Sequence, residues 1–320
     1  MRRTVLLSTL LLAFAASVHA ADRYVVIVSG ATGEPEYADR YEAWRQTLIK
    51  TFVDRMAVDP SHVDVLFDGA DETHAATAAN VRRALDALRA KMHGDDVALV
   101  VLIGHGTFDG LEAKFNLVGP DLTSAQWAAL LKPLPGHVAV VDTTAASFPF
   151  LEQLSGPRRI VITATDSAAQ RFDTVFPEYF ARALGDEAAD LDKNGRISIW
   201  EAFLSASLGV RRYYEQRGQL ATERALLDDN GDGRGREAGG EGTDGVEASR
   251  FYFDPDRTDA PPADEQLLML LQKRESLRAD ADDLRQRKVL MTPDEYAKEF
   301  ERLMIELART TREIRRRGKT

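Results

Sequence analysis

Residues 96–106 read Asp-Val-Ala-Leu-Val-Val-Leu-Ile-Gly-His-Gly, and this stretch decides the fold. A short, continuous run of branched apolar residues that ends in glycine is typical of a strand buried on both faces of a parallel sheet. In such sheets the chemistry gathers at the carboxyl ends of the central strands, where we expect His105. A neutral imidazole there is suited to act as a general base. The alternative is a histidine that only caps the strand end and bonds a neighbouring carbonyl.

Apolar runs alternate with amphipathic stretches from residue 21 to residue 183. The runs at 24–29, 63–67, 97–103, 137–141 and 159–164 predict strands, with helices between them. This alternation implies right-handed crossovers and helices on both faces of a mostly parallel α/β sheet, in a domain spanning residues 21–217. Strands 97–103 and 137–141 should be neighbours. His105 is then expected beside the turn at residues 143–147.

The first twenty residues predict a secretory signal peptide, with a basic start, an apolar centre and small residues before a cleavage site after Ala20. Their apolar run is shorter than the roughly 20 residues that a membrane-spanning helix needs, so no stable membrane insertion is expected after cleavage. The mature chain is expected to be exported, either periplasmic or secreted. Since it has no cysteine, its stability must come from a buried core and not from disulfides.

The chain is acidic. Loss of Arg2 and Arg3 with the signal peptide leaves 39 basic residues (41 − 2) against 51 acidic ones, a formal net charge of −12. This balance argues against nucleic acid and anionic membranes as partners. It suits a protein that binds divalent cations.

The strand at 137–141 is followed by a short polar turn, Asp-Thr-Thr-Ala-Ala-Ser. A strand ending in His-Gly and a next strand ending in such a turn resemble the legumain and caspase-like cysteine peptidases. The resemblance implies a caspase-like fold, makes His105 and Gly106 the base motif, and puts the nucleophile position at Ala145. It also implies a substrate pocket after strand 159–164, with Asp166 as a candidate to receive a basic side chain. Because Ala145 has no thiol, the resemblance implies an inactive relative that binds a peptide or protein partner.

An active hydrolase is the first alternative. A hydroxyl of the same turn would replace the thiol and His105 would be the base; the candidate hydroxyls are Thr143, Thr144 and Ser147. A hydroxyl needs far more activation than a thiol, which is partly ionised near neutral pH. The acids that are candidates to orient the imidazole are Asp109 and Asp142.

Residues 190–201, Asp-Leu-Asp-Lys-Asn-Gly-Arg-Ile-Ser-Ile-Trp-Glu, resemble the calcium loop of an EF-hand. Oxygen donors fall at positions 1, 3, 5, 7 and 12, and a glycine at position 6 allows the sharp turn. The expected calcium ligands are Asp190, Asp192, Asn194, the carbonyl of Arg196 and Glu201. The alternative is an acidic turn that only caps the helix following it.

A second, degenerate copy of this loop is expected at residues 228–239, where positions 1, 3 and 5 are Asp228, Asn230 and Asp232. Position 12 of this copy is glycine, so the site should be weak, with Glu237 or Glu241 as possible sources of the missing carboxylate. Residues 218–263 are acidic and rich in glycine. They predict a linker without regular structure.

Residues 264–320 predict two heptad-patterned helices. Leucine or methionine recurs every seven residues from Leu270 to Met291, and Thr292 with Glu295 forms a capping box before the second helix. Two such helices suggest a coiled-coil hairpin through which the chain could associate with itself. A further alternative for the function is therefore a calcium-dependent adaptor whose working surface is this hairpin.

Overall fold

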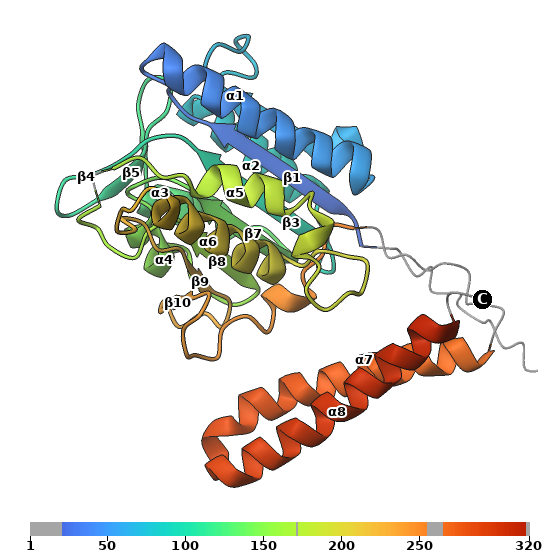
Figure 1. Cartoon of the computed structure of the whole chain (residues 1–320). Helices are drawn as coiled ribbons and strands as arrows, with labels where there is room; N and C mark the ends of the chain where they lie inside the picture. Colours follow the sequence, from blue (N-terminus) through green and yellow to red (C-terminus); the bar gives the residue numbers. More distant parts are fainter. Residues whose placement is uncertain (1–20, 171, 255–264, 318–320) are drawn as a thin grey trace, which may run out of the picture.

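The computed structural model describes residues 21–170, 172–254 and 265–317. Its centre is a seven-stranded sheet in the order β10-β9-β8-β7-β3-β1-β2 (Figure 1). Five of its strands are parallel; they are β1 (Arg23–Ser29), β2 (Val63–Phe67) at the edge, β3 (Val97–Ile103), β7 (His137–Asp142) and β8 (Arg159–Thr163). The predicted mostly parallel α/β fold is confirmed. The predicted signal peptide lies outside the described residues.

Helices cover both faces of the sheet and enclose two cores. One face carries α1 (Pro35–Lys50), α5 (Phe176–Ala183) and α6 (Ile199–Gln216); the other carries α2 (Ala78–Lys91), α3 (Ser124–Leu131) and α4 (Phe148–Leu154). Successive strand residues point to opposite faces, so Val101 enters the core under α1 while Val100 enters the core under α2. Burial on both faces explains why the runs are continuously apolar.

Strand β3 lies between β1 and β7, as expected. Its register puts Leu102 opposite Asp142, so the loops that follow β3 and β7 start at the same edge of the sheet. A small antiparallel sheet follows His105 directly, formed by β4 (Gly106–Phe108), β5 (Ala113–Phe115) and β6 (Leu122–Thr123). The sequence did not predict it. Gly106 is needed there because a Cβ at this position would lie 2.6 Å from Thr144 Oγ1.

The prediction that residues 218–263 have no regular structure is wrong at residues 226–228, 236–237 and 248–250. Strand β9 (Leu226–Asp228) adds antiparallel to β8, and β10 (Arg236–Glu237) adds to β9. Leu227 is fully buried in the sheet core, and residues 248–253 also contribute to it. The sequence pattern did not predict this structure because the segment has few apolar residues. Hydrogen bonds from main-chain amides to carboxylates supply much of its internal structure. Residues 255–263 lie outside the described part of the chain.

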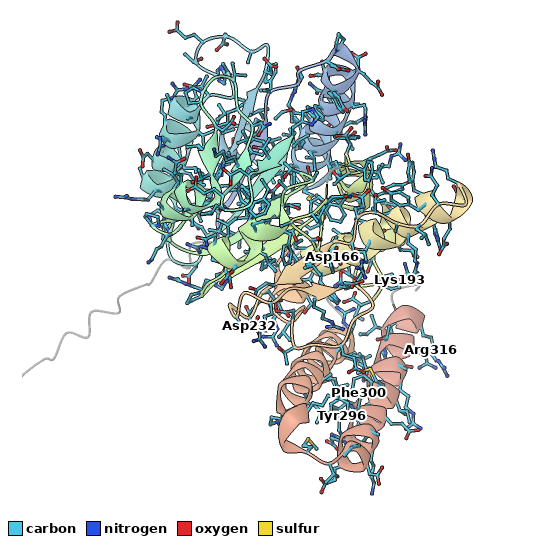
Figure 2. All side chains as sticks on the ribbon, turned by 90° about the vertical axis from the view of Figure 1, so that its left-hand side faces the viewer. Asp166, Lys193, Asp232, Tyr296, Phe300 and Arg316 are labelled. Atoms are coloured by element: carbon cyan, nitrogen blue, oxygen red, sulfur yellow. The ribbon has the colours of Figure 1, made fainter. Side chains whose placement is uncertain are left out.

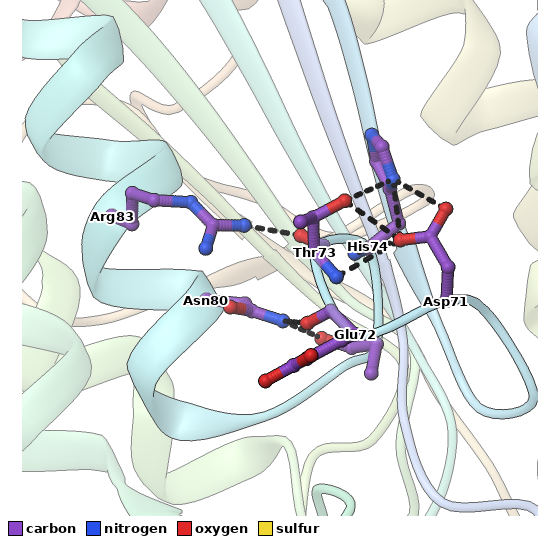
Figure 3. A network of polar contacts seen from close by, with 7 residues as sticks. Asp71, Glu72, Thr73, His74, Asn80 and Arg83 are labelled. Atoms are coloured by element: carbon purple, nitrogen blue, oxygen red, sulfur yellow. Dashed lines mark hydrogen bonds and ion pairs between the residues drawn. The ribbon is translucent and has the colours of Figure 1, made fainter.

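A polar network fixes the loop between β2 and α2 (Figure 3). Asp71 accepts hydrogen bonds from the main-chain amides of Thr73 and His74 and from the Thr73 hydroxyl. These bonds hold the pKa of Asp71 well below its ordinary value, and the bond from the Thr73 side chain has the largest effect. Asn80 and Arg83, near the start of α2, donate to carbonyls of the loop. The network therefore anchors the amino end of α2 at the same edge of the sheet as His105.

The C-terminal segment forms a helical hairpin of α7 (Glu265–Gln286) and α8 (Pro293–Arg317), joined by a short 3-10 turn (Figure 1). The two helices pack on each other around a small core of their own, formed by Leu277, Ala281, Leu284 and Leu303. This core is separate from the two cores of the sheet. Among the described helices, none is long and apolar enough to cross a membrane.

Candidate functional site

A cleft opens at the carboxyl edge of the sheet, beside the end of β3. It has a volume of about 90 Å³ and is lined by three segments: Tyr37, Arg40, Tyr41 and Trp44 of α1; Gly104, His105, Gly106 and Ala145 at the sheet edge; and Asp173, Thr174 and Pro177 at and before the start of α5. The structure thus brings together His105, Gly106 and Ala145, which the sequence analysis had placed in one site. Four aromatic or imidazole rings and two opposite charges line the same small space.

His105 lies against a carboxylate that the sequence analysis missed. Its Nδ1 is 3.7 Å from Oδ1 of Asp173, and the edge of the Tyr37 ring packs on the imidazole with centroids 4.4 Å apart. The Tyr37 hydroxyl donates to the other oxygen of Asp173, and this bond raises the pKa of Tyr37. Asp173 therefore orients both the imidazole and the phenol. The two acids proposed for this role take no part in it.

Those two acids serve the fold. Asp109 closes a turn by accepting hydrogen bonds from the main-chain amides of Leu111 and Glu112. Asp142 is fully buried below the cleft, where one carboxylate oxygen accepts from the Thr144 amide at 2.9 Å and the other has no partner. Burial raises the pKa of Asp142 to about 7. Neither carboxylate lines the cleft that contains His105.

The loop that presents Asp173 is fixed by a second buried acid, Glu223. Its carboxylate accepts hydrogen bonds from the main-chain amides of Val175 and Phe176 at 2.8 and 3.1 Å, at the amino end of α5. The Thr174 hydroxyl donates to the carbonyl of Thr143, which ties this loop to the turn after β7. Burial raises the pKa of Glu223 to about 7. No sequence motif marks either acid, because each contact joins residues far apart in the chain.

The three hydroxyls of the alternative hydrolase point into the protein. Thr143 Oγ1 donates to the carbonyl of Leu102 at 2.7 Å, and Ser147 Oγ lies 3.0 Å from Thr165 Oγ1. Thr144 Oγ1 is buried without a partner. All three residues are at most 1% exposed, and none lines the cleft. In the cleft, the turn contributes only Ala145.

Asp166 comes shortly after β8, at the predicted edge of the sheet, and does not line this cleft. Figure 2 marks its position. Its carboxylate pairs with the guanidinium of Arg224 at 2.7 Å. Arg224 also lies 3.6 Å from Glu237. The basic group that Asp166 was expected to receive from a substrate is thus supplied by the chain itself.

The loop at residues 190–201 brings together three of its five predicted ligand residues. Single oxygens of Asp190, Asp192 and Glu201 lie within 4.8 Å of one another. Asp190 accepts from the amides of Asn194 and Gly195, and the loop turns at Lys193 and Gly195, which have φ of 58° and 83° (Figure 2 labels Lys193). The side chains at positions 1, 3 and 12 therefore converge, as an EF-hand-type loop requires.

Glu201 has two roles in this loop. One carboxylate oxygen accepts from the amides of Leu191 and Asp192, at 2.9 and 3.2 Å. The other accepts from Ser198, whose hydroxyl in turn caps the Glu201 amide, so the two residues form a capping box at the start of α6. Glu201 therefore caps α6 through Oε2, as the alternative interpretation expected. Its Oε1 lies on the loop side, beside Asp190 and Asp192.

The second loop repeats most of the hydrogen-bond pattern of the first. Asp228 accepts from the amides of Gly231 and Gly233, positions 4 and 6 of its loop, whereas Asp190 accepts from positions 5 and 6 of its own. Asn230 accepts from the Asp232 amide, and Asp232 from the amide of residue 234. At the same relative positions in the first loop, Asp192 accepts from residue 194 and Asn194 from residue 196.

Asp244 takes the place of Glu201 in this second loop. It accepts from the amides of Asp229 and Asn230, at 3.1 and 3.4 Å, which are positions 2 and 3. The suggestion that Glu237 or Glu241 supplies this carboxylate is wrong, since Asp244 occupies the place. Burial raises the pKa of Asp244 to about 6, and the nearby carboxylates contribute.

The first loop is tied to the segment that leads to the hairpin. The Ile197 amide donates to the Asp254 carboxylate at 3.1 Å, and the Ile199 amide donates to the carbonyl of Phe251 at 3.0 Å. Ser198 forms an isolated antiparallel bridge with Tyr252. Main-chain contacts therefore join the loop at residues 190–201 to residues 251–254.

Comparison with known proteins assigns no family to the chain. No protein-family model matches it, and no curated protein matches it. Among solved structures, it is similar to a structural-genomics target from Geobacter sulfurreducens. That similarity has a TM-score of 0.44 and 14% sequence identity, and covers 65% of this chain and 92% of the other.

Proposed function

We propose that this chain is a catalytically inactive relative of the legumain and caspase-like peptidases that binds a peptide or protein segment in the His105 cleft. The observation that carries the proposal is the shared position of Ala145 and His105. Both line one cleft, at the ends of adjacent strands β7 and β3. A methyl group thus occupies the place where this clan carries the nucleophilic thiol.

Burial of the neighbouring hydroxyls supports binding over hydrolysis. A serine or threonine nucleophile must reach both its base and the substrate. Thr143 and Ser147 direct their hydroxyls to groups inside the fold, and Thr144 is 0% exposed. Their use as nucleophiles would require the turn after β7 to rearrange.

The walls of the cleft suit a peptide. Arg40 lies over the rings of Tyr37 and Trp44, at 5.6 and 5.1 Å, which presents a flat apolar wall with a charged edge. Asp173 and His105, which both contact Tyr37, offer polar groups in the same cleft. The cleft therefore combines aromatic rings with charged and hydrogen-bonding groups, and a peptide segment can contact both.

Calcium is proposed as the structural cofactor of the loop at residues 190–201, with Asp190, Asp192, Asn194, the Arg196 carbonyl and Glu201 as ligands. Asp190 and Glu201 are buried, and neither forms an ion pair among the described residues. Their converging oxygens repel one another, and a divalent ion relieves that repulsion. The loop at Asp228, Asn230 and Asp232 is proposed as a weaker second site, completed by Asp244.

Export to the periplasm or the medium is also proposed. The basic start, the apolar centre and the small residues near Ala20 support it.

One observation favours the adaptor alternative. The contact between Ile197 and Asp254 links the proposed calcium loop to the segment that precedes α7. An adaptor of this kind would capture a partner through α7 and α8 only when calcium is bound. Loss of partner binding on removal of the hairpin, with the cleft intact, would identify it.

The test of peptide binding uses a mixed peptide library and the mature chain. We expect a subset of peptides to be retained and none to be shortened, as measured by mass spectrometry. Ala145→Phe should abolish retention because the ring fills the cleft. Ala90→Phe, at an exposed position on α2, is the matched control and should bind like the parent protein. Cleavage of peptides, or retention unchanged by Ala145→Phe, would contradict the proposal.

A further inference from the structure

The outer face of α8 carries a stripe that is complementary to itself. Glu301, Ile305, Ala308 and Arg312 follow one another at intervals of four, three and four residues, so they lie on one side of the helix. All four are exposed, and Ile305 is 44% exposed. Leu303, which packs against α7, lies on the opposite side. The intramolecular core of the hairpin therefore leaves this stripe uncovered.

The order of the stripe is acid, apolar, apolar, base. When the helix is reversed the order becomes base, apolar, apolar, acid, which is the complement of the first. Among the described residues, neither Glu301 nor Arg312 forms an ion pair, although neighbouring charges do, such as Arg302 with Glu299 and Glu306. Two charges that flank an exposed isoleucine are thus left for a partner outside the chain.

The whole of α8 has the same polarity. Residues 293–306 contain five acidic and two basic residues, a net charge of −3, while residues 307–317 contain five basic residues and one acidic residue, a net charge of +4. In a twofold-symmetric pair, each surface meets a copy of itself with its direction reversed. An antiparallel pair sets the acidic half against the basic half, whereas a parallel pair sets like charges together.

We propose that α8 is a self-association surface whose occupant is the α8 helix of a second copy of this chain, packed antiparallel. The twofold axis passes between residues 306 and 307. Glu301 then faces Arg312 of the second copy, and Ile305 faces the small side chain of Ala308, which lets the helices approach closely. The result is a dimer in which α8 helices from two hairpins pack together at the centre. Exposed ion pairs contribute little each, so the dimer is modest in affinity and weakens as salt rises.

The test measures the mass of the mature chain by sedimentation velocity over a range of concentrations. The parent protein should dimerise. Glu301→Arg and Arg312→Glu should each raise the dimer dissociation constant roughly tenfold or more, since each creates like-charge contacts at two symmetric places. The double variant Glu301→Arg/Arg312→Glu should restore the dimer because the stripe is again its own complement. Arg89→Glu, an exposed change on α2, should have no effect.

Cross-linking tests the direction of the helices, since the chain has no cysteine of its own. A mixture of Glu301→Cys and Arg312→Cys proteins should give disulfide-linked heterodimers on mild oxidation, while each protein alone should give few. A parent protein that stays monomeric at every concentration would overturn the proposal. So would a dimer that the single charge reversals leave intact, or cross-linking of each variant mainly to itself.

Discussion

The imidazole Nδ1 of His105 lies 3.7 Å from Oδ1 of Asp173, although the two residues belong to separate loops. His105 follows β3, and Asp173 precedes α5 on the α1 side of the sheet. A carboxylate beside the ring holds the imidazole in one orientation, with its other nitrogen free to face the cleft. The imidazole and the carboxylate therefore lie side by side at a site where the turn after β7 contributes only the methyl group of Ala145.

Calcium should stabilise the mature protein through Glu201. At a calcium concentration 100 times the dissociation constant, binding adds about 2.7 kcal/mol to the free energy of unfolding, which corresponds to roughly 5–10 °C in melting temperature. Glu201→Gln should lose most of this gain, because the carboxylate that faces Asp190 and Asp192 becomes neutral. Magnesium should do less, as it gives up its water reluctantly. Thermal unfolding with calorimetric titration measures both effects.

The matched control is Glu215→Gln at the exposed end of the same helix α6, which should respond to calcium like the parent. In the calorimetric titration, Asp244→Asn should affect only the weaker of the two calcium-binding events. An equal calcium-dependent shift in the parent and in Glu201→Gln would rule out the proposed ligand set.

Asp142 should make stability depend on pH. Burial raises its pKa from 3.8 to about 7, so between these values the folded state binds the proton more tightly than the unfolded state. The free energy of unfolding therefore falls as pH rises from about 4 to about 7, by up to roughly 4 kcal/mol at about 1.4 kcal/mol per pKa unit. Asp142→Asn removes this loss of stability. The melting temperature of the variant should therefore exceed that of the parent by more at pH 8 than at pH 5. The exposed change Asp86→Asn should show no such difference between the two pH values.

Gly106→Ala should destabilise the protein by about 1–3 kcal/mol, the usual cost of overpacking. The added Cβ would lie 2.6 Å from Thr144 Oγ1 and 3.0 Å from Ala146 Cβ, where the loops after β3 and β7 touch. Gly94→Ala is the control, since a Cβ there meets nothing within 4 Å. Chemical denaturation of both variants gives the comparison. Equal stabilities would mean that the two loops are further apart than described.

Removal of residues 255–320 should leave the sheet domain folded, because Leu277, Leu284 and Leu303 form a core that is separate from the sheet. The shortened protein should melt cooperatively, near the temperature of the mature chain. A chain ended at Leu220 should not, since it loses β9 and the buried side chains of Leu226 and Leu227. Loss of cooperative melting in the protein that lacks only residues 255–320 would show that the hairpin supports the sheet.

The sequence predicted those features that depend on local pattern. Apolar runs gave the five parallel strands, four of which are buried on both faces, and the spacing from Asp190 to Glu201 marked a loop whose carboxylate oxygens do converge. Contacts between residues far apart in the chain could not be predicted from the sequence. Asp173 and Asp244 occupy their places only after the chain has folded, and β9 is a short strand that depends on pairing with β8.

The most direct test of the central claim is the reactivity of a thiol placed at position 145. The variant Ala145→Cys carries the chain's single cysteine, and alkylation rates measured against pH give the pKa of its thiol. If position 145 faces His105, that pKa should lie below the ordinary value of about 8.5 and should return toward it when His105→Ala is added. Ala90→Cys on α2 supplies the reference for an exposed thiol. A thiol at position 145 that titrates like the reference, with no change on His105→Ala, would contradict the account.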